Sequence, residues 1–180
     1  FGRVGSPLSV YVPLLDPTWA LDVSAGLGRL AFSRLGLAVW LAVVGLGALL
    51  MARHWGALTA GLADQVFTAQ NLLLMLLCYP LVKTLHEFGH ALAVRRWGGE
   101  VREMGVVFII LFPVPYGAAS ASSSFRSRGQ RAAVGAAWMM VDLFLAALAM
   151  FAWVLAEPGI ARALATNVIA IAGVSTLLVN

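Results

Sequence analysis

Of the 180 residues, 61% are hydrophobic and only 11% are charged, and the mean hydropathy is +0.90. Soluble domains carry about 45–50% apolar and about 25% charged residues, so the composition indicates an integral membrane protein with little soluble mass. The net charge is +4, and no basic patch interleaved with aromatic residues suggests nucleic acid as a partner. Cys78 is the only cysteine, which excludes an intrachain disulfide and a thiolate metal site.

Residues 1–26 mix Gly, Pro, Asp and Ser with scattered apolar residues, and they predict a juxtamembrane segment that lies along the surface. Residues 27–180 form the predicted transmembrane core. The chain begins with Phe1 and ends at Asn180, directly after an apolar run. We therefore expect a piece of a longer protein, truncated at its C-terminal end.

Four apolar segments are long enough to predict membrane-spanning helices, since a bilayer needs about 20 residues. They cover about residues 30–51, 71–97, 132–155 and 163–179. In the second segment, Asn71 is the expected N-cap and Pro80 is expected to kink the helix. In the fourth, Asn167 and several small residues suit contacts between helices.

Residues 98–129 are too polar to span a membrane. The run 106–112 is β-branched and aromatic, and it is bounded by Gly105, Pro113 and Pro115. This pattern predicts a strand or a re-entrant piece. The predicted fold class is therefore an all-α integral membrane protein with about four transmembrane helices, and a short membrane-associated β or re-entrant segment between the second and third.

Arginine placement predicts the orientation. One side would hold nine arginines: Arg3, Arg29, Arg34, Arg95, Arg96, Arg102, Arg126, Arg128 and Arg131. The opposite side would hold only Arg53 and Arg162. By the positive-inside rule, the N-terminus and the 95–131 loop are expected in the cytoplasm.

The second segment contains two histidines four residues apart, with a glutamate directly after the first: His86-Glu87-Phe88-Gly89-His90. On a helix, His86 and His90 lie one turn apart on the same face, so both imidazoles can reach one metal ion. Glu87 flanks this face and can accept a proton from a metal-activated water. The pattern predicts a Zn²⁺ site with His86 and His90 as ligands and Glu87 as the catalytic base.

The motif belongs to one polar stripe in an otherwise apolar segment. Lys83, His86, Glu87 and His90 follow at i, i+3, i+4 and i+7. A structural stripe with a Lys83–Glu87 pair is the plain alternative, but ionisable groups in a span usually mark a site. A catalytic zinc takes three protein ligands, and two are visible. Asp142, inside the third segment, could be the third ligand, hydrogen-bond a ligating histidine, or pair with Lys83.

These features together resemble the site-2 proteases, and most closely their bacterial branch of peptide zinc metalloproteases. Besides the histidine motif, the resemblance includes Tyr79-Pro80-Leu81-Val82-Lys83, Gly98-Gly99-Glu100-Val101, Phe112-Pro113-Val114-Pro115-Tyr116, Phe125-Arg126-Ser127-Arg128 with Gln130-Arg131, and Val141-Asp142-Leu143-Phe144. An acidic residue often follows the Pro-Tyr pair in that branch. Here Gly117 and Ala118 stand instead, so any role of that carboxylate is absent.

The resemblance implies an intramembrane zinc endopeptidase of the bacterial inner membrane. Its substrates would be membrane-associated or exported polypeptides, hydrolysed through a zinc-activated water. The resemblance places the third zinc ligand in an Asp-Gly pair beyond Asn180, with Asp142 as the fallback within this chain. It also supports the idea that the strand 106–112 holds an extended substrate by edge pairing.

Two other functions fit parts of the pattern. The chain could be a catalytically silent membrane subunit of a peptide export or maturation system. It could also be an ion or proton transporter that uses Lys83, Glu87 and Asp142, although the polar groups cluster on one helix and no inverted repeat is visible.

Overall fold

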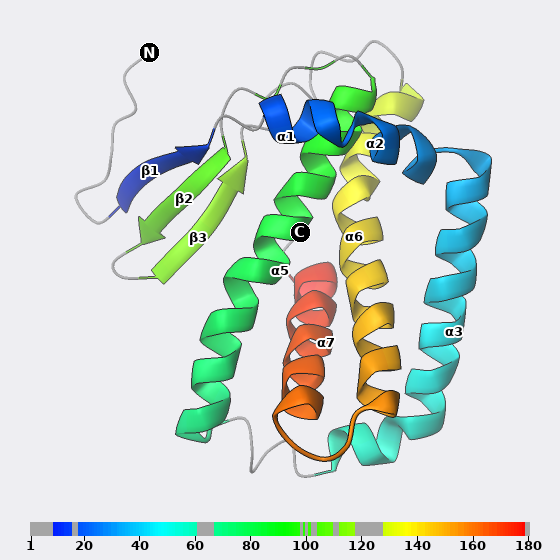
Figure 1. Cartoon of the computed structure of the whole chain (residues 1–180), viewed down its shortest axis with the longest axis vertical. Coiled ribbons are helices and arrows are strands. Elements are labelled where there is room, and N and C mark those ends of the chain that lie inside the picture. The colour runs from blue at the N-terminus through cyan, green and yellow to red at the C-terminus, as the bar shows by residue number, and fades with distance from the viewer. Residues whose placement is uncertain are drawn as a thin grey trace. The chain divides into compact units, whose positions relative to one another are not determined.

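The computed structural model describes residues 9–15, 18–60, 67–97, 99, 101, 104–109, 112–117 and 128–178. Helices dominate, and a small sheet accompanies them (Figure 1). The residues group into two compact units, each built from two stretches of chain. Unit 1 comprises Phe1–Ser33 with Lys83–Trp138, and unit 2 comprises Arg34–Val82 with Met139–Asn180.

The four predicted spans are all helices: α3 (Arg34–Thr59), α5 (Ala69–Arg96), α6 (Arg128–Leu155) and α7 (Ile160–Leu178). Within the described residues, α3, α5 and α6 are long and apolar enough to cross a membrane. In α7 the stretch Ile160–Gly173 is apolar but shorter. The first span was predicted too early along the chain. The helix instead runs on to Thr59, because the stretch after Arg53 and His54 has no helix-breaking proline.

Helix α5 begins and ends on identifiable signals. The hydroxyl of Thr68 accepts the backbone N–H of Asn71 at 3.3 Å, so Thr68 supplies the N-cap bond and the predicted cap at Asn71 is wrong. Pro80 lies inside the helix, which continues past it. At the other end, the N–H of Gly99 donates to the Val94 carbonyl at 3.0 Å, the bond expected where a helix ends on glycines.

In unit 2, α3 and α6 approach closely at Gly47. A Cβ built on Gly47 would lie 2.6 Å from the Cβ of Ala147, well inside van der Waals contact. Near this crossing, the indole N–H of Trp40 donates to the backbone carbonyl of Met140 at 2.8 Å. Small residues at such a crossing let two apolar helices pack through their backbones.

Helix α7 joins unit 2 through buried and polar contacts. The amide of Asn167, almost fully buried, donates to the side-chain oxygen of Asn71 on α5 at 2.8 Å, which confirms its expected role in helix contacts. Cys78 is buried beside Val82 and Ala172. Gly159, which follows Pro158 directly before α7, has φ +156°, a backbone conformation that side chains disfavour.

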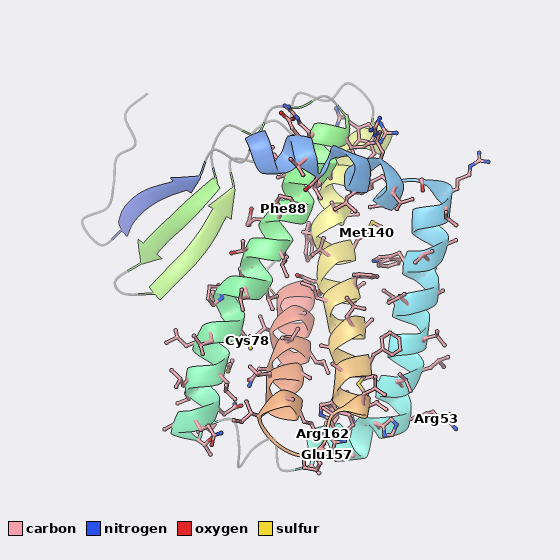
Figure 2. All side chains as sticks on the ribbon, viewed as in Figure 1. Arg53, Cys78, Phe88, Met140, Glu157 and Arg162 are labelled. Atoms are coloured by element: carbon pink, nitrogen blue, oxygen red, sulfur yellow. The ribbon has the colours of Figure 1, made fainter. Side chains whose placement is uncertain are left out.

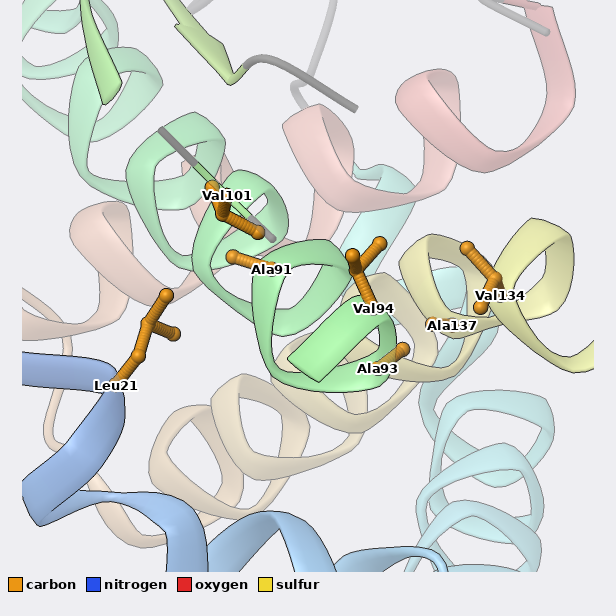
Figure 3. Packing of buried hydrophobic residues seen from close by; sticks show 7 residues of the cluster. All are labelled: Leu21, Ala91, Ala93, Val94, Val101, Val134 and Ala137. Atoms are coloured by element: carbon orange, nitrogen blue, oxygen red, sulfur yellow. The ribbon is translucent and has the colours of Figure 1, made fainter. Parts of the chain in front are cut away.

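Unit 1 has its own small apolar core, formed by the last turns of α5, Val101 beyond it, the first turns of α6 and the short helix α1 (Thr18–Val23). The short helix α2 (Ala25–Ala31) follows α1. Figure 3 shows the seven buried members of this core: Leu21, Ala91, Ala93, Val94, Val101, Val134 and Ala137. The ring of Phe32 lies 5.2 Å from that of Trp97, centroid to centroid, at the margin of this core. Asp22 on α1 pairs with Arg95 on α5 at 2.5 Å.

The sheet of unit 1 is antiparallel, in the order β1 (Ser9–Leu15), β2 (Met104–Ile109), β3 (Phe112–Gly117). The predicted single strand 106–112 is therefore wrong in extent, because the run contributes to two antiparallel strands, whose register pairs Ile109 with Phe112. Strand β1 was not predicted at all. Its signal is the alternation around Tyr11, Ser-Val-Tyr-Val, within a segment that was interpreted as surface-lying coil.

Prolines occupy only the two outer strands. Pro113 and Pro115 lie in β3 and Pro13 lies in β1, whereas the central β2 has none. Proline lacks a backbone N–H, so it fits only where that group points away from the neighbouring strand. Pro113 and Pro115 are two residues apart in β3, so their backbone nitrogens point to the same side of the strand. The outer edge of β3 therefore lacks two backbone N–H donors and cannot form the full set of hydrogen bonds to an added strand.

Candidate metal centre

The polar stripe of α5 faces protein. Lys83, His86, Glu87 and His90 are all half-buried, whereas Leu81 and Leu85 beside them are 66% and 47% exposed. Figure 2 shows the side chains along this helix, including Phe88 within the motif. A soluble helix would show the reverse, with leucines inside and charges outside. The three motif side chains therefore lie on the sheltered side of the helix, as the zinc prediction requires.

His86 and His90 come close to the separation that a shared metal needs. Their ring centroids are 6.5 Å apart and the rings stand at 89° to one another. Two imidazoles on one tetrahedral zinc, at Zn–N distances of ~2.0–2.1 Å, have centroids roughly 5 Å apart. The two rings therefore stand about 1.5 Å farther apart than in such a zinc site.

His90 carries the feature that most favours a ligand. Its Nδ1 atom is buried and has no hydrogen-bond partner in the part of the chain that the structure describes. A buried polar atom left unpaired costs about 1–3 kcal/mol, and native proteins rarely leave such groups unsatisfied. A bound cation would relieve this cost, because a neutral imidazole nitrogen is a good ligand for Zn²⁺. The two imidazoles present are thus of the chemical type that Zn²⁺ prefers.

Trp138 on α6 is a neighbour of the motif that sequence reasoning missed. Its ring centroid lies 5.8 Å from that of His86 with a 37° tilt, and the side chain is only 6% exposed. The indole forms an apolar wall that restricts the His86 ring. The sequence offered one signal for it. Trp138 precedes Asp142 by four residues, which places the two on the same face of α6.

The remaining predicted residues are sheltered as well. Asp142 is fully buried in α6, and Lys83, Glu87 and Asp142 each take part in at least one polar or electrostatic interaction. Among the described residues, no three His, Cys, Asp or Glu side chains gather where they could hold a metal ion. The roles considered for Asp142, as a zinc ligand or as a partner of a histidine or of Lys83, stay predictions.

Comparison with known proteins adds no second line of inference. No protein-family model, curated protein or solved structure matches this chain.

Proposed function

We propose that this chain carries the metal-binding and proton-accepting part of an intramembrane zinc metalloprotease. The observation that carries the proposal is the pair His86 and His90 on one sheltered face of an apolar helix, with a buried, unpartnered Nδ1 on His90. Two histidines and a carboxylate are costly on such a helix unless they serve a site. The resemblance to site-2 proteases supports the same chemistry.

A membrane location is part of the proposal. Three helices in the described residues are apolar enough to span, and α3 exposes large side chains along its length, among them Leu35, Leu41 and Leu49. At the same time, Asp142 and Asn167 are buried. Exposed apolar patches of this extent mark a surface that meets lipid or another protein. Arginine placement puts the N-terminus and the 95–131 loop in the cytoplasm, and the inner membrane of a bacterium follows from the family resemblance.

Each motif residue has a defined task in peptide hydrolysis. His86 and His90 hold the metal through one neutral nitrogen each, with the Trp138 indole restricting the ring of His86. A zinc ion at this position would polarise the scissile carbonyl and make a bound water acidic. Glu87 accepts the proton of the attacking water and passes it to the leaving amine. The resemblance places a third ligand outside the described residues.

The substrate would reach the site as an extended segment, because a helical peptide shields its carbonyls by hydrogen bonds. Strand β2 cannot take it by edge pairing, since β1 and β3 already occupy both of its edges. Strand β3 is a poor edge for pairing, because Pro113 and Pro115 have no backbone N–H to donate. Strand β1, whose only proline is Pro13, is therefore the better edge for an added strand. This replaces the expectation that the run 106–112 itself receives the substrate.

The deciding experiment is Glu87→Gln in the full natural protein, with cleavage of a membrane-anchored reporter peptide as the readout. We expect the variant to keep its zinc and to lose cleavage by at least about 100-fold, the usual contribution of a general base. Glu157→Gln, an exposed glutamate in the loop before α7, is the matched control and should cleave normally. Retained cleavage in Glu87→Gln would remove the role assigned to Glu87. A wild-type protein that binds no zinc and cuts nothing would leave the silent membrane subunit as the better assignment.

A further inference from the structure

A basic pocket in unit 1 lies outside the candidate metal centre. It has a volume of about 300 Å³, and its lining residues come from α2 and from the last turns of α5: Gly28, Arg29, Leu92, Arg95 and Arg96. This size is at the lower end of the ~300–1,000 Å³ found for small-molecule sites. A Cβ built on Gly28 would stand 3.8 Å from Leu92, an ordinary van der Waals distance, so α2 and α5 lie close together at this glycine.

The charge of this pocket is one-sided. Three guanidinium groups line it, and among the described residues only the carboxylate of Asp22 is paired with one of them, at Arg95. Within the described part of the chain, two positive charges there thus have no carboxylate partner. Arg29 and Arg96 are both exposed, so their side chains can turn toward a ligand. Guanidinium groups hold phosphate oxygens through paired hydrogen bonds, which makes a phosphate the natural counter-ion.

The short helices that contribute to the pocket or precede it also expose apolar side chains. Val23, Leu27 and Leu30, on the same short helices as Arg29, are 69%, 62% and 54% exposed. The Phe32–Trp97 ring pair lies at the end of these helices, and aromatic residues of this kind favour the level of the lipid headgroups. Inorganic phosphate has no apolar part that could cover exposed leucine side chains near the arginines. A phospholipid has one, because its acyl chains can cover them.

We propose that Arg29, Arg95 and Arg96 form a binding site for the phosphate group of an anionic phospholipid. Leu92 and Gly28 form its floor, and Leu27 and Leu30 contact the acyl chains. The bound lipid neutralises the arginine cluster and holds α2 against the end of α5, a few residues beyond His90. The proposal rests on the membrane location argued above and not on zinc chemistry, so its test requires neither metal nor cleavage.

The test is native mass spectrometry of the full chain in nonionic detergent, titrated with dioleoyl phosphatidylglycerol or with dioleoyl phosphatidylcholine. The acyl chains are the same, so the comparison isolates the headgroup charge. We expect phosphatidylglycerol to bind at least about tenfold more tightly, and the double variant Arg29→Gln/Arg96→Gln to lose most of this preference. The control Arg34→Gln/Arg53→Gln removes the same two charges from positions that do not line the pocket, and it should keep the preference.

Asp22→Asn provides a test in the opposite direction. Removing the carboxylate frees Arg95 for the lipid, and phosphatidylglycerol should then bind about fivefold more tightly. Inorganic phosphate at millimolar concentration should not displace the lipid. Equal binding of the two lipids, an equal loss in the Arg34/Arg53 control, unchanged or weaker binding in Asp22→Asn, or displacement by inorganic phosphate would each overturn the proposal.

Discussion

Among the described residues, His90 gives the strongest support to the proposed metal site. Its Nδ1 atom is buried without a partner in the described part of the chain, while His86 is held beside the Trp138 indole. The third histidine, His54, is different. Its ring lies 5.9 Å from that of Trp153, an ordinary aromatic contact.

Replacing each histidine by alanine separates these roles. We expect His90→Ala and His86→Ala to reduce bound zinc from one per chain to well below a tenth, because a zinc site that loses one of its few protein ligands loses most of its affinity. His54→Ala should keep its zinc. The measurement is metal content by plasma mass spectrometry after purification in the presence of zinc. Equal zinc loss in all three variants would mean that the fold is affected and not a site.

At the scale of elements, Gly45 and Gly47 of α3 are two residues apart but have different surroundings. Gly47 touches Ala147 of α6, whereas a Cβ on Gly45 would meet nothing within 4 Å. The contact at Gly47 is closer than two side chains with Cβ atoms can come, so it depends on the missing side chain.

We therefore expect Gly47→Ala to destabilise unit 2 by about 1–3 kcal/mol, the usual cost of overpacking. Gly45→Ala should be neutral or slightly stabilising, because alanine is the better helix former. Thermal unfolding in one detergent, followed by circular dichroism, compares the two variants with the parent. If the two alanine variants unfold at the same temperature, the close approach of α3 and α6 is wrong.

The sheet shows how much of an element a local pattern contains. The β-branched run after Gly105 predicts extended backbone, and the structure has extended backbone there. The pattern says nothing about the antiparallel pairing of Ile109 with Phe112, nor about the pairing of Ser9 with Ile109. Strand pairing joins residues that are distant along the chain, so no short window of sequence contains it.

For the whole molecule, the arginine asymmetry predicts one orientation in the membrane. Arg53, Glu157 and Arg162 gather at one end of unit 2 (Figure 2), where Arg162 stacks on Trp153 with 4.3 Å between guanidinium carbon and ring centroid. This end carries few arginines, so it should face away from the cytoplasm.

Cysteine accessibility tests this orientation. In a Cys78→Ala background, Glu157→Cys should react with a membrane-impermeant maleimide added to intact cells, and Arg131→Cys should react only after the membrane is opened. The buried position of Cys78 makes alanine a mild replacement there. Labelling in the reverse order would place the 95–131 loop outside and would contradict the predicted orientation.

The sequence by itself determined the apolar helices, the polar stripe on α5 and the identity of the motif residues, because hydropathy and helical spacing are local properties of the chain. Only the tertiary structure decided which glycine carries the α3–α6 contact, that Asn71 bonds to Asn167 instead of capping its helix, that Trp138 packs on His86, and that β1 completes the sheet. Each of these joins residues far apart in sequence. Their free energy comes from packing and desolvation between elements, which no periodicity within one element records.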